Sequence, residues 1–299
     1  MSTSASPTVA PVRCIWPLAA TLGEGALWSM REQSLYFVDI LGRRLHRFRP
    51  ADGASQSWEF EEEISALCER RDAPGLLVSL RHGLALFDPA DGCLQRLCKP
   101  EAERPDNRFN DGKCDAAGRW WIGSTDFACT QPTGALYCYE GNGRCRRMRD
   151  GVHISNGPTW SADGRHLYLN ETGHLRTWRH AFDMDSGELG PARLWLQHDP
   201  ADGAPDGMTT DATGNVWIAR WGGSAVTCHG PDGHELARIV LPTAHITSVC
   251  FGGPDLRTLF ITSARQDLDA AQLEAQPLAG ALFAVTLDVA GVPAHRFAG

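Results

Sequence analysis

The chain has 299 residues, of which 21% are charged, and its formal net charge at pH 7 is −8. This length can bury a substantial core, and the acidic balance argues against a nucleic-acid partner. No apolar run approaches the length of a membrane span, and the start lacks the basic and apolar regions of a secretory signal. We therefore expect a cytoplasmic protein with neither nucleic-acid nor membrane partners.

The N-terminal residues differ in composition from the rest of the chain. Residues 1–13, "MSTSASPTVAPVR", are predicted to form a short disordered tail, and residues 14–299 a single domain. The ten cysteines show no CxxC or paired spacing. We interpret them as reduced thiols in a cytoplasmic protein, because neither a disulfide framework nor a metal motif is visible.

From residue 23 onward the chain repeats one pattern: a leading polar residue, a short strand, a turn and a hydrophobic strand. It is clearest in "GEGALWSMREQSLYFVD" (23–39), "FNDGKCDAAGRWWIGS" (109–124), "SNGPTWSADGRHLYLN" (155–170) and "PDGMTTDATGNVWIAR" (205–220). Two segments that begin at Ile64 and Ile246 fit more loosely. The leading positions are therefore 24, 64, 110, 156, 206 and 246.

A second hairpin follows most of these units, as in "LALFDPADG" and "ALYCYEGNG". Two hairpins in each of six units of 40–50 residues predict an all-β fold, a six-bladed β-propeller with four strands per blade. The helical composition of residues 265–280 predicts a short insertion in the last blade, stopped by Pro277 and Gly280. The strand "RCIWPLA" is predicted to close the ring by pairing with C-terminal strands.

The leading residue of each repeat should lie at one mouth of the central channel, because the first strand of each blade lines it. Around the ring these residues are Glu24, Ile64, Asn110, Asn156, Asp206 and Ile246. Two carboxylates and two amide oxygens favour a hard cation such as Ca²⁺, Mg²⁺ or Mn²⁺. The alternative is that these residues only form turns, as Asn-Gly and Asp-Gly often do. Glu24 favours the metal site, because it keeps the position although glutamate is a poor turn residue.

Several of these segments resemble one known family. "LGEG", "RFNDGK", "ISNGPTWSADGRHLY", "PDGMTTDATGNVW" and "CFGGPDLRTLFITSAR" are similar to hallmark segments of the senescence marker protein/regucalcin/gluconolactonase family. The resemblance extends over nearly the whole chain and is closest to bacterial sugar aldonolactonases, including xylonolactonases. It implies a six-bladed propeller that holds one catalytic divalent cation.

The resemblance also implies roles for individual residues. Glu24, Asn156 and Asp206 would bind the cation, which could be Ca²⁺, Zn²⁺, Mn²⁺, Mg²⁺ or Fe²⁺. Asn110 would lie beside it, and Arg108 and Asn110 would contact substrate oxygens. Asp206 would also be the general base for the attacking water.

Two departures from the family pattern concern the substrate pocket. Where relatives carry acidic residues, this chain has "STDFACTQPTG", in which Asp126 is the candidate substrate contact. In "YLNETGH" the residues Asn170 and Glu171 stand where relatives usually have Asp before Ser or Thr. Either one of these residues replaces the usual acidic substrate contacts, or the sugar contacts differ here.

The resulting functional prediction is metal-dependent hydrolysis of a sugar-acid lactone, of the gluconolactone or xylonolactone type, to the free aldonic acid. The protein would act as a monomer or weak homo-oligomer. One alternative is a calcium-binding regulator without turnover, and another is a phosphotriesterase or arylesterase that uses the same metal site. Ser155 and Ser224 do not lie in a GxSxG motif, so a serine hydrolase is disfavoured.

Overall fold

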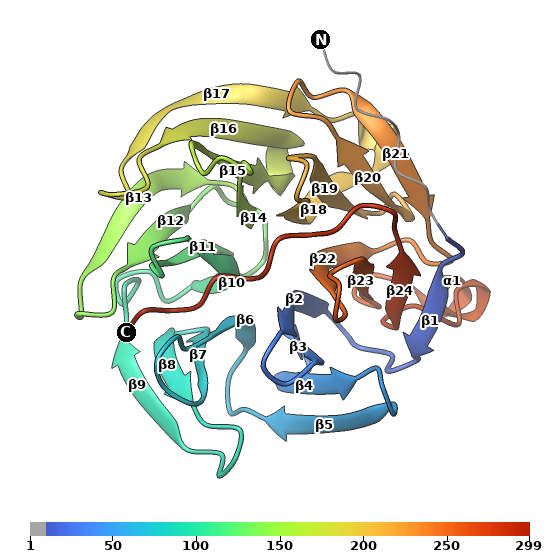
Figure 1. The fold of residues 1–299 in the computed structure, drawn as a ribbon, viewed down its shortest axis with the longest axis horizontal. Coiled ribbons are helices and arrows are strands. Elements are labelled where there is room, and N and C mark those ends of the chain that lie inside the picture. The colour runs from blue at the N-terminus through green and yellow to red at the C-terminus, as the bar shows by residue number, and fades with distance from the viewer. Residues whose placement is uncertain (1–9) are drawn as a thin grey trace.

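Six four-stranded antiparallel sheets surround a central channel in the computed structural model, which describes residues 10–299 (Figure 1). Within most sheets the strands follow one another in sequence, from the channel to the outer edge. This arrangement confirms the predicted six-bladed propeller.

The first three blades consist of consecutive strands. Blade 1 comprises β2 (Gly23–Ser29), β3 (Ser34–Asp39), β4 (Arg44–Arg49) and β5 (Ala54–Glu59). Blade 2 comprises β6 (Ile64–Glu69), β7 (Leu76–Leu80), β8 (Gly83–Phe87) and β9 (Leu94–Cys98). Blade 3 comprises β10 (Asn107–Cys114), β11 (Trp120–Asp126), β12 (Gly134–Tyr139) and β13 (Cys145–Val152).

The remaining blades include two short 3₁₀ turns and the helix. Blade 4 comprises β14 (Ser155–Trp160), β15 (His166–Glu171), β16 (Arg176–Phe182) and β17 (Leu189–Gln197), with a 3₁₀ turn at Thr172–His174. Blade 5 follows a 3₁₀ turn at Pro200–Asp202 and comprises β18 (Ala204–Thr210), β19 (Val216–Trp221), β20 (Ala225–His229) and β21 (Glu235–Val240). Blade 6 comprises β22 (Ile246–Gly252), β23 (Thr258–Ser263), β24 (Leu282–Thr286) and β1 (Arg13–Trp16).

The innermost strands begin within three residues of the predicted leading positions. In each of the six, the pairing with the second strand shifts register at or just after the leading position. Such β-bulges bend a strand and re-aim its side chains. The bulges therefore recur where the sequence places its polar ring.

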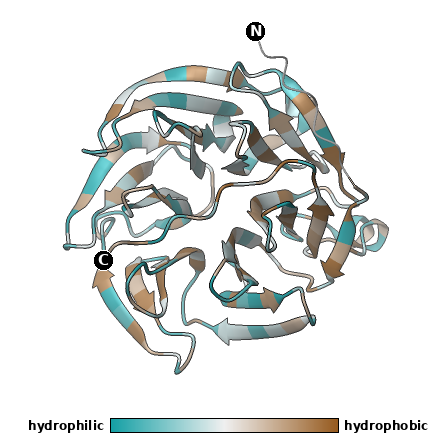
Figure 2. Cartoon of the chain, viewed as in Figure 1, coloured by the Kyte–Doolittle hydropathy of each residue, from teal (hydrophilic) through white to brown (hydrophobic). Residues whose placement is uncertain are grey.

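The core lies between neighbouring blades, where apolar faces of adjacent sheets meet. Hydrophobic residues dominate β22 to β24, whereas hydrophilic stretches mark the outer strand β13 (Figure 2). The repeat tryptophans also hold the turns that precede them. Nε1 of Trp121 donates to Asp115 (2.9 Å) and Nε1 of Trp217 donates to Asp211 (3.0 Å). Both indoles are fully buried, so their role is packing rather than sugar contact.

The last blade joins both ends of the chain. Arg13 of β1 pairs with Ala284 of β24, as predicted for ring closure. The backbone nitrogen of Ala10 donates to the carbonyl of Thr286 (3.1 Å). The described part of the predicted tail is therefore attached to the ring, and residues 1–9 lie outside the described residues.

The predicted insertion contains helix α1 (Ala270–Ala275), which begins with a capping box between Asp269 and Gln272. No helix within residues 10–299 is both long and apolar enough to cross a membrane.

A C-terminal strap, residues 291–299, crosses the channel mouth opposite the leading residues (Figure 1). Gly291 bridges to Asp211, and Phe297 bridges to Arg70 and is buried. Beneath the strap lies a cavity of about 300 Å³. The residues four places after each leading position all line it: Trp28, Cys68, Cys114, Trp160, Thr210 and Cys250. Neither Glu24 nor Asp206 lines this cavity, so it is separate from the site predicted at the leading residues.

Candidate active site

The four polar leading residues converge at the channel mouth on the innermost strands of blades 1, 3, 4 and 5. Each is at most 5% exposed: Glu24, Asn110, Asn156 and Asp206. Asn110 Nδ2 donates to Asn156 Oδ1 (2.6 Å), which links blades 3 and 4. Blades 2 and 6 contribute the fully buried Ile64 and Ile246. The ring therefore has a polar side and two apolar positions.

The two carboxylates of the ring are buried near each other. Burial raises the pKa of Glu24 well above its usual value, and the nearby charges of Asp206 and Asp111 raise it further. Burial likewise raises the pKa of Asp206, with Asp111 as the next cause. Asp206 Oδ1 is buried and has no hydrogen-bond partner among the described residues. Two such groups strongly favour a positive charge between them.

Asp111 is a third carboxylate that the sequence analysis missed. Its Oδ1 accepts from the backbone nitrogen of Gly112 (2.7 Å), and its Oδ2 accepts from that of Gly157 (2.8 Å). Burial raises its pKa, and the charge of Lys113 opposes that shift. Asp111 follows Asn110 directly, and neighbouring residues of a regular strand would face opposite sides. The bulge between Phe109 and Gly112 breaks that alternation.

Gly157 explains why an Asn-Gly pair occupies the leading position of blade 4. Its φ is +51°, and a Cβ atom there would lie 2.8 Å from the Met208 backbone nitrogen and 3.1 Å from the Asp206 carbonyl oxygen. Glycine therefore lets β14 approach the backbone of β18. The space that a side chain at residue 157 would fill is occupied by the neighbouring blade.

Arg108 lies beside the ring and is 6% exposed. Its Nη1 donates to Asn110 Oδ1 (2.5 Å) and to the carbonyl of Phe109 (3.1 Å). This contact fixes the Asn110 amide, so that its Nδ2 faces Asn156. The guanidinium also favours the charged forms of Glu24 and Asp206.

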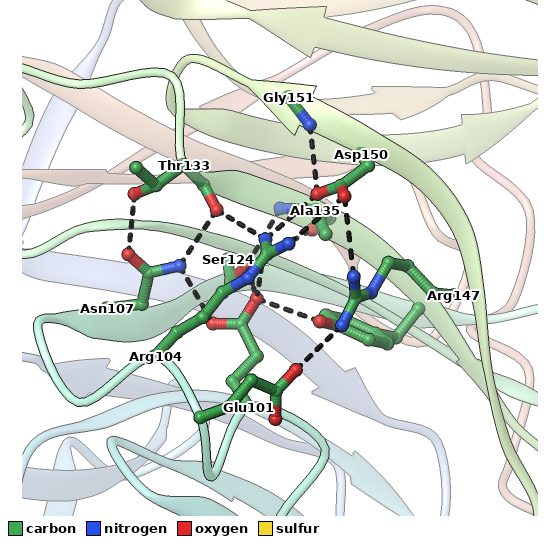
Figure 3. Close-up of polar contacts among 11 residues, drawn as sticks. Glu101, Arg104, Asn107, Ser124, Thr133, Ala135, Arg147, Asp150 and Gly151 are labelled. Atoms are coloured by element: carbon green, nitrogen blue, oxygen red, sulfur yellow. Dashed lines mark hydrogen bonds and ion pairs between the residues drawn. The ribbon is translucent and has the colours of Figure 1, made fainter.

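A polar network at the start of β10 holds this segment in place (Figure 3). Asn107 Nδ2 donates to Glu101 Oε2 (3.1 Å) and to the carbonyl of Thr133 (3.0 Å), whose hydroxyl donates back to Asn107 Oδ1 (2.7 Å). Ser124 donates to the other oxygen of Glu101 (2.6 Å). The strand that carries Arg108 and Asn110 is therefore anchored immediately before them.

Asp126 and Glu171 are held by their surroundings rather than by the ring. Asp126 Oδ2 accepts from the backbone nitrogen and hydroxyl of Thr130 (2.9 and 3.0 Å), and the backbone bond lowers the pKa of Asp126. Glu171 Oε2 accepts from Trp178 Nε1 (2.7 Å) and Arg149 Nη2 (3.4 Å). Asp126 stabilises its own loop, and its role as a substrate contact remains a prediction.

The residues of the ring fit a hard divalent cation. The Asp206 oxygen without a partner, the Glu24 carboxylate and the amide oxygen of Asn156 form an all-oxygen donor set. The charge of Asp206 raises the pKa of Glu24, so a cation between these carboxylates would be favourable. No group of three or more His, Cys, Asp or Glu side chains is arranged as metal ligands within residues 10–299. The proposed ligands Glu24, Asn156 and Asp206 do not form such a group, because only two of them are carboxylates and the third is an amide.

Comparison with known proteins places this site in context. Residues 22–265 match the family model described as SMP-30/Gluconolactonase/LRE-like region. The 6-deoxy-6-sulfogluconolactonase of Pseudomonas putida is 36% identical over 289 residues, covering 96% of this chain and 99% of its own. The pentonolactonase XacC of Haloferax volcanii is 34% identical over 283 residues, covering 92% and 94%.

A solved structure agrees with the sequence relatives. The calcium-binding protein regucalcin from Agrobacterium tumefaciens superposes with a TM-score of 0.92 at 30% identity, covering 96% of this chain and 97% of its own. The family model spans residues 22–265, the part of the chain that contains all four polar leading residues. The chain belongs to the SMP-30/gluconolactonase/LRE-like family.

Proposed function

We propose that this protein is a divalent-metal-dependent lactonase that hydrolyses a sugar-acid lactone to the free aldonic acid. The observation that carries the proposal is the buried pair Glu24 and Asp206, with Asp206 Oδ1 unpartnered at the channel mouth. Relatives with lactonase names support the reaction class.

Glu24, Asn156 and Asp206 would hold the cation. When bound, a divalent cation supplies Lewis-acid polarisation of an ester carbonyl. Asp206 has an oxygen without a hydrogen-bond donor, and its raised pKa brings it closer to the range of a general base. We assign it the proton of the attacking water.

Arg108 and Asn110 would orient the substrate. The guanidinium has five N–H donors, and Nη1 is the donor that contacts Asn110 and Phe109. Its other donors can bind lactone hydroxyl or ring oxygens, and such orientation contributes strongly to catalysis. The rigid start of β10 would keep this geometry during turnover.

The test is a hydrolysis assay on five- and six-carbon aldonolactones, with protein stripped of metal by EDTA and then titrated with Ca²⁺, Mn²⁺, Mg²⁺, Zn²⁺ or Fe²⁺. Spontaneous ring opening is subtracted at each pH. We expect metal-dependent turnover that Asp206→Ala abolishes at saturating metal. Paraoxon and an aryl ester serve as comparison substrates.

A calcium-binding regulator is the second candidate, because the Agrobacterium tumefaciens structure is of a calcium-binding protein. It predicts tight Ca²⁺ binding with no lactone hydrolysis above the spontaneous rate. That result across the whole panel would replace the enzymatic proposal.

A further inference from the structure

A chain of buried hydrogen bonds extends from Asp206 into the interface between blades 4 and 5. Asn170, on β15, donates from Nδ2 to the backbone carbonyl of Asp206 (2.5 Å). The hydroxyl of Thr177, its cross-strand partner, donates to Asn170 Oδ1 (2.6 Å). The same hydroxyl lies 2.7 Å from His198 Nε2. His198 Nδ1 lies 2.6 Å from Arg220 Nη1.

Every bond in this chain has a single permitted direction. A guanidinium can only donate, so His198 Nδ1 must accept from Arg220 and the imidazole proton must be on Nε2. That N–H donates to Thr177, whose one hydroxyl proton goes to Asn170. A backbone carbonyl can only accept, so the argument from the Asp206 end gives the same directions. The Asn170 amide is therefore fixed in one orientation.

The surroundings keep this chain intact. Asn170 and Thr177 are fully buried, and Arg220 is 2% exposed. Burial lowers the pKa of His198 to about 3, and the Arg220 charge acts in the same direction, so the ring stays neutral. The partners of Arg220 are neutral, because its other bonds go to Thr227 Oγ1 (2.9 Å) and His229 Nε2 (3.2 Å). A buried cation is costly, and the carboxylates of Asp202 and Glu235 stabilise the charge of Arg220 without a hydrogen bond to it. The hydrogen bonds of the guanidinium are thus left for the neutral acceptors, which indicates a specific structural use.

Blade 4 holds β18 at a second point. Thr172 donates from its hydroxyl to the Pro205 carbonyl (2.7 Å) and accepts from Asn156 Nδ2 (2.9 Å). Two successive carbonyls of β18 are thus bound by side chains of blade 4, next to the bulge that directs Asp206 to the mouth.

We infer that Asn170 is a positioning residue for Asp206, and that Thr177, His198 and Arg220 form a relay that fixes the orientation of the Asn170 amide. The inference rests on the proposed function in one respect, namely that Asp206 binds the cation and accepts the proton of the attacking water. The relay holds the backbone of Asp206 from outside the channel, so it affects catalysis without touching substrate.

The decisive variants are Thr177→Val and Thr177→Ser. Valine has nearly the shape of threonine but removes the hydroxyl, whereas serine restores it. We expect Thr177→Val to weaken Mn²⁺ binding 10–100-fold, the range typical for partners that orient a metal ligand. It should lower kcat more than it changes KM, and Thr177→Ser should stay within about threefold of the parent for both quantities.

Thr227→Val is the matched control. Thr227 is equally buried and also bonds to Arg220, but it lies on the branch toward His229, away from Asp206. We expect it to lower the melting temperature while leaving the Kd for Mn²⁺, measured by calorimetry, unchanged. Equal Mn²⁺ affinities for the parent and Thr177→Val would overturn the inference. Equal weakening by Thr227→Val would overturn it too, because the effect would then be general destabilisation.

The ¹⁵N NMR shifts of the His198 ring test the relay without metal or substrate. We expect Nε2 of His198 to be protonated and Nδ1 to be unprotonated in the parent protein. The opposite tautomer would refute the relay even if the protein is a lactonase. Conversely, a parent that shows the expected tautomer but neither binds divalent ions nor hydrolyses lactones would refute the proposed function while the relay stands.

Discussion

Replacing Gly157 by alanine should separate backbone strain from the contact between blades 4 and 5. The residue follows Asn156 in the ring, and its φ of +51° is unfavourable for alanine. The added Cβ would also meet the backbone of β18 at Met208 and Asp206. Gly53 is the matched control, because its φ is +73° and no heavy atom lies within 4 Å of the corresponding Cβ position.

The expected magnitudes follow from these two environments. A side chain in the left-handed region lowers the free energy of unfolding by about 1–2 kcal/mol. Alanine also restricts the unfolded chain more than glycine does, which raises the free energy of unfolding by about 0.4–1 kcal/mol. Gly53→Ala should therefore lower the free energy of unfolding by about 1 kcal/mol. Gly157→Ala adds overpacking of about 1–3 kcal/mol and should lower it by about 2–4 kcal/mol. Relief of this overpacking requires β18 to move away from β14, and Asp206 would move with β18.

Urea unfolding in EDTA measures the stability difference, and calorimetric titration with Mn²⁺ measures the consequence for the site. We expect Gly157→Ala to bind the ion more weakly than the parent and Gly53→Ala to bind it equally well. If both variants lost the same stability, or if Gly157→Ala bound Mn²⁺ with parental affinity, the close approach of β14 and β18 would not shape the site.

Three further predictions concern charge. Asp206→Asn should raise the melting temperature of the metal-free protein, because it removes a buried carboxylate whose charged form is disfavoured by burial and by the charge of Asp111. It should also abolish the stabilisation by added Ca²⁺ in a thermal-shift assay. An undiminished Ca²⁺ effect would place the ion elsewhere. Arg108→Ala should lower kcat/KM for the best lactone by about 10- to 150-fold, equivalent to a lost charged hydrogen bond of about 1.5–3 kcal/mol. The calorimetric Kd for Mn²⁺ should change much less, because a guanidinium cannot be a metal ligand. Parental kinetics would contradict a substrate contact. Burial lowers the pKa of His46 to about 4. As the pH falls below 6.5, His46 is therefore protonated in the unfolded chain before it is protonated in the folded protein. Between pH 7 and 5 this one group should lower the free energy of unfolding by about 2 kcal/mol. Urea unfolding at both pH values should show a smaller loss in His46→Gln, and an equal loss would mean that other groups cause it.

The ring could be predicted from sequence because it depends on local features that repeat. Glu24, Asn110, Asn156 and Asp206 share one position in units of similar length, so their convergence follows from the propeller symmetry. The helical insertion was predictable because Pro277 and Gly280 are local signals, whereas ring closure was inferred from the topology of a closed propeller. The structure confirms these elements.

What sequence reasoning missed depends on geometry that does not repeat. Asp111 acts on the charges of Glu24 and Asp206 although it directly follows Asn110, and the bulge in its strand shifts the alternation of inward and outward residues. Asn170 bonds to Asp206 across a blade interface, and that contact depends on the angle between two sheets. The only sequence signal for Asn170 was its departure from the family pattern. Where the second strand of a blade carries a polar residue that departs from the family pattern, that residue is therefore worth testing as a hydrogen-bond partner of the neighbouring blade.

The sharing of blade 6 by the two ends of the chain has a consequence for biosynthesis. β1 precedes every other strand in the chain, whereas its partner β24 follows all of them. During translation β1 therefore has no partner until blades 1 to 5 and the other strands of blade 6 have been made. Limited proteolysis of nascent chains stalled before β24 should find cleavage between β1 and β2, and this cleavage should disappear once β24 has emerged. A ribosome that stops before β24 leaves a product whose sixth blade cannot be completed.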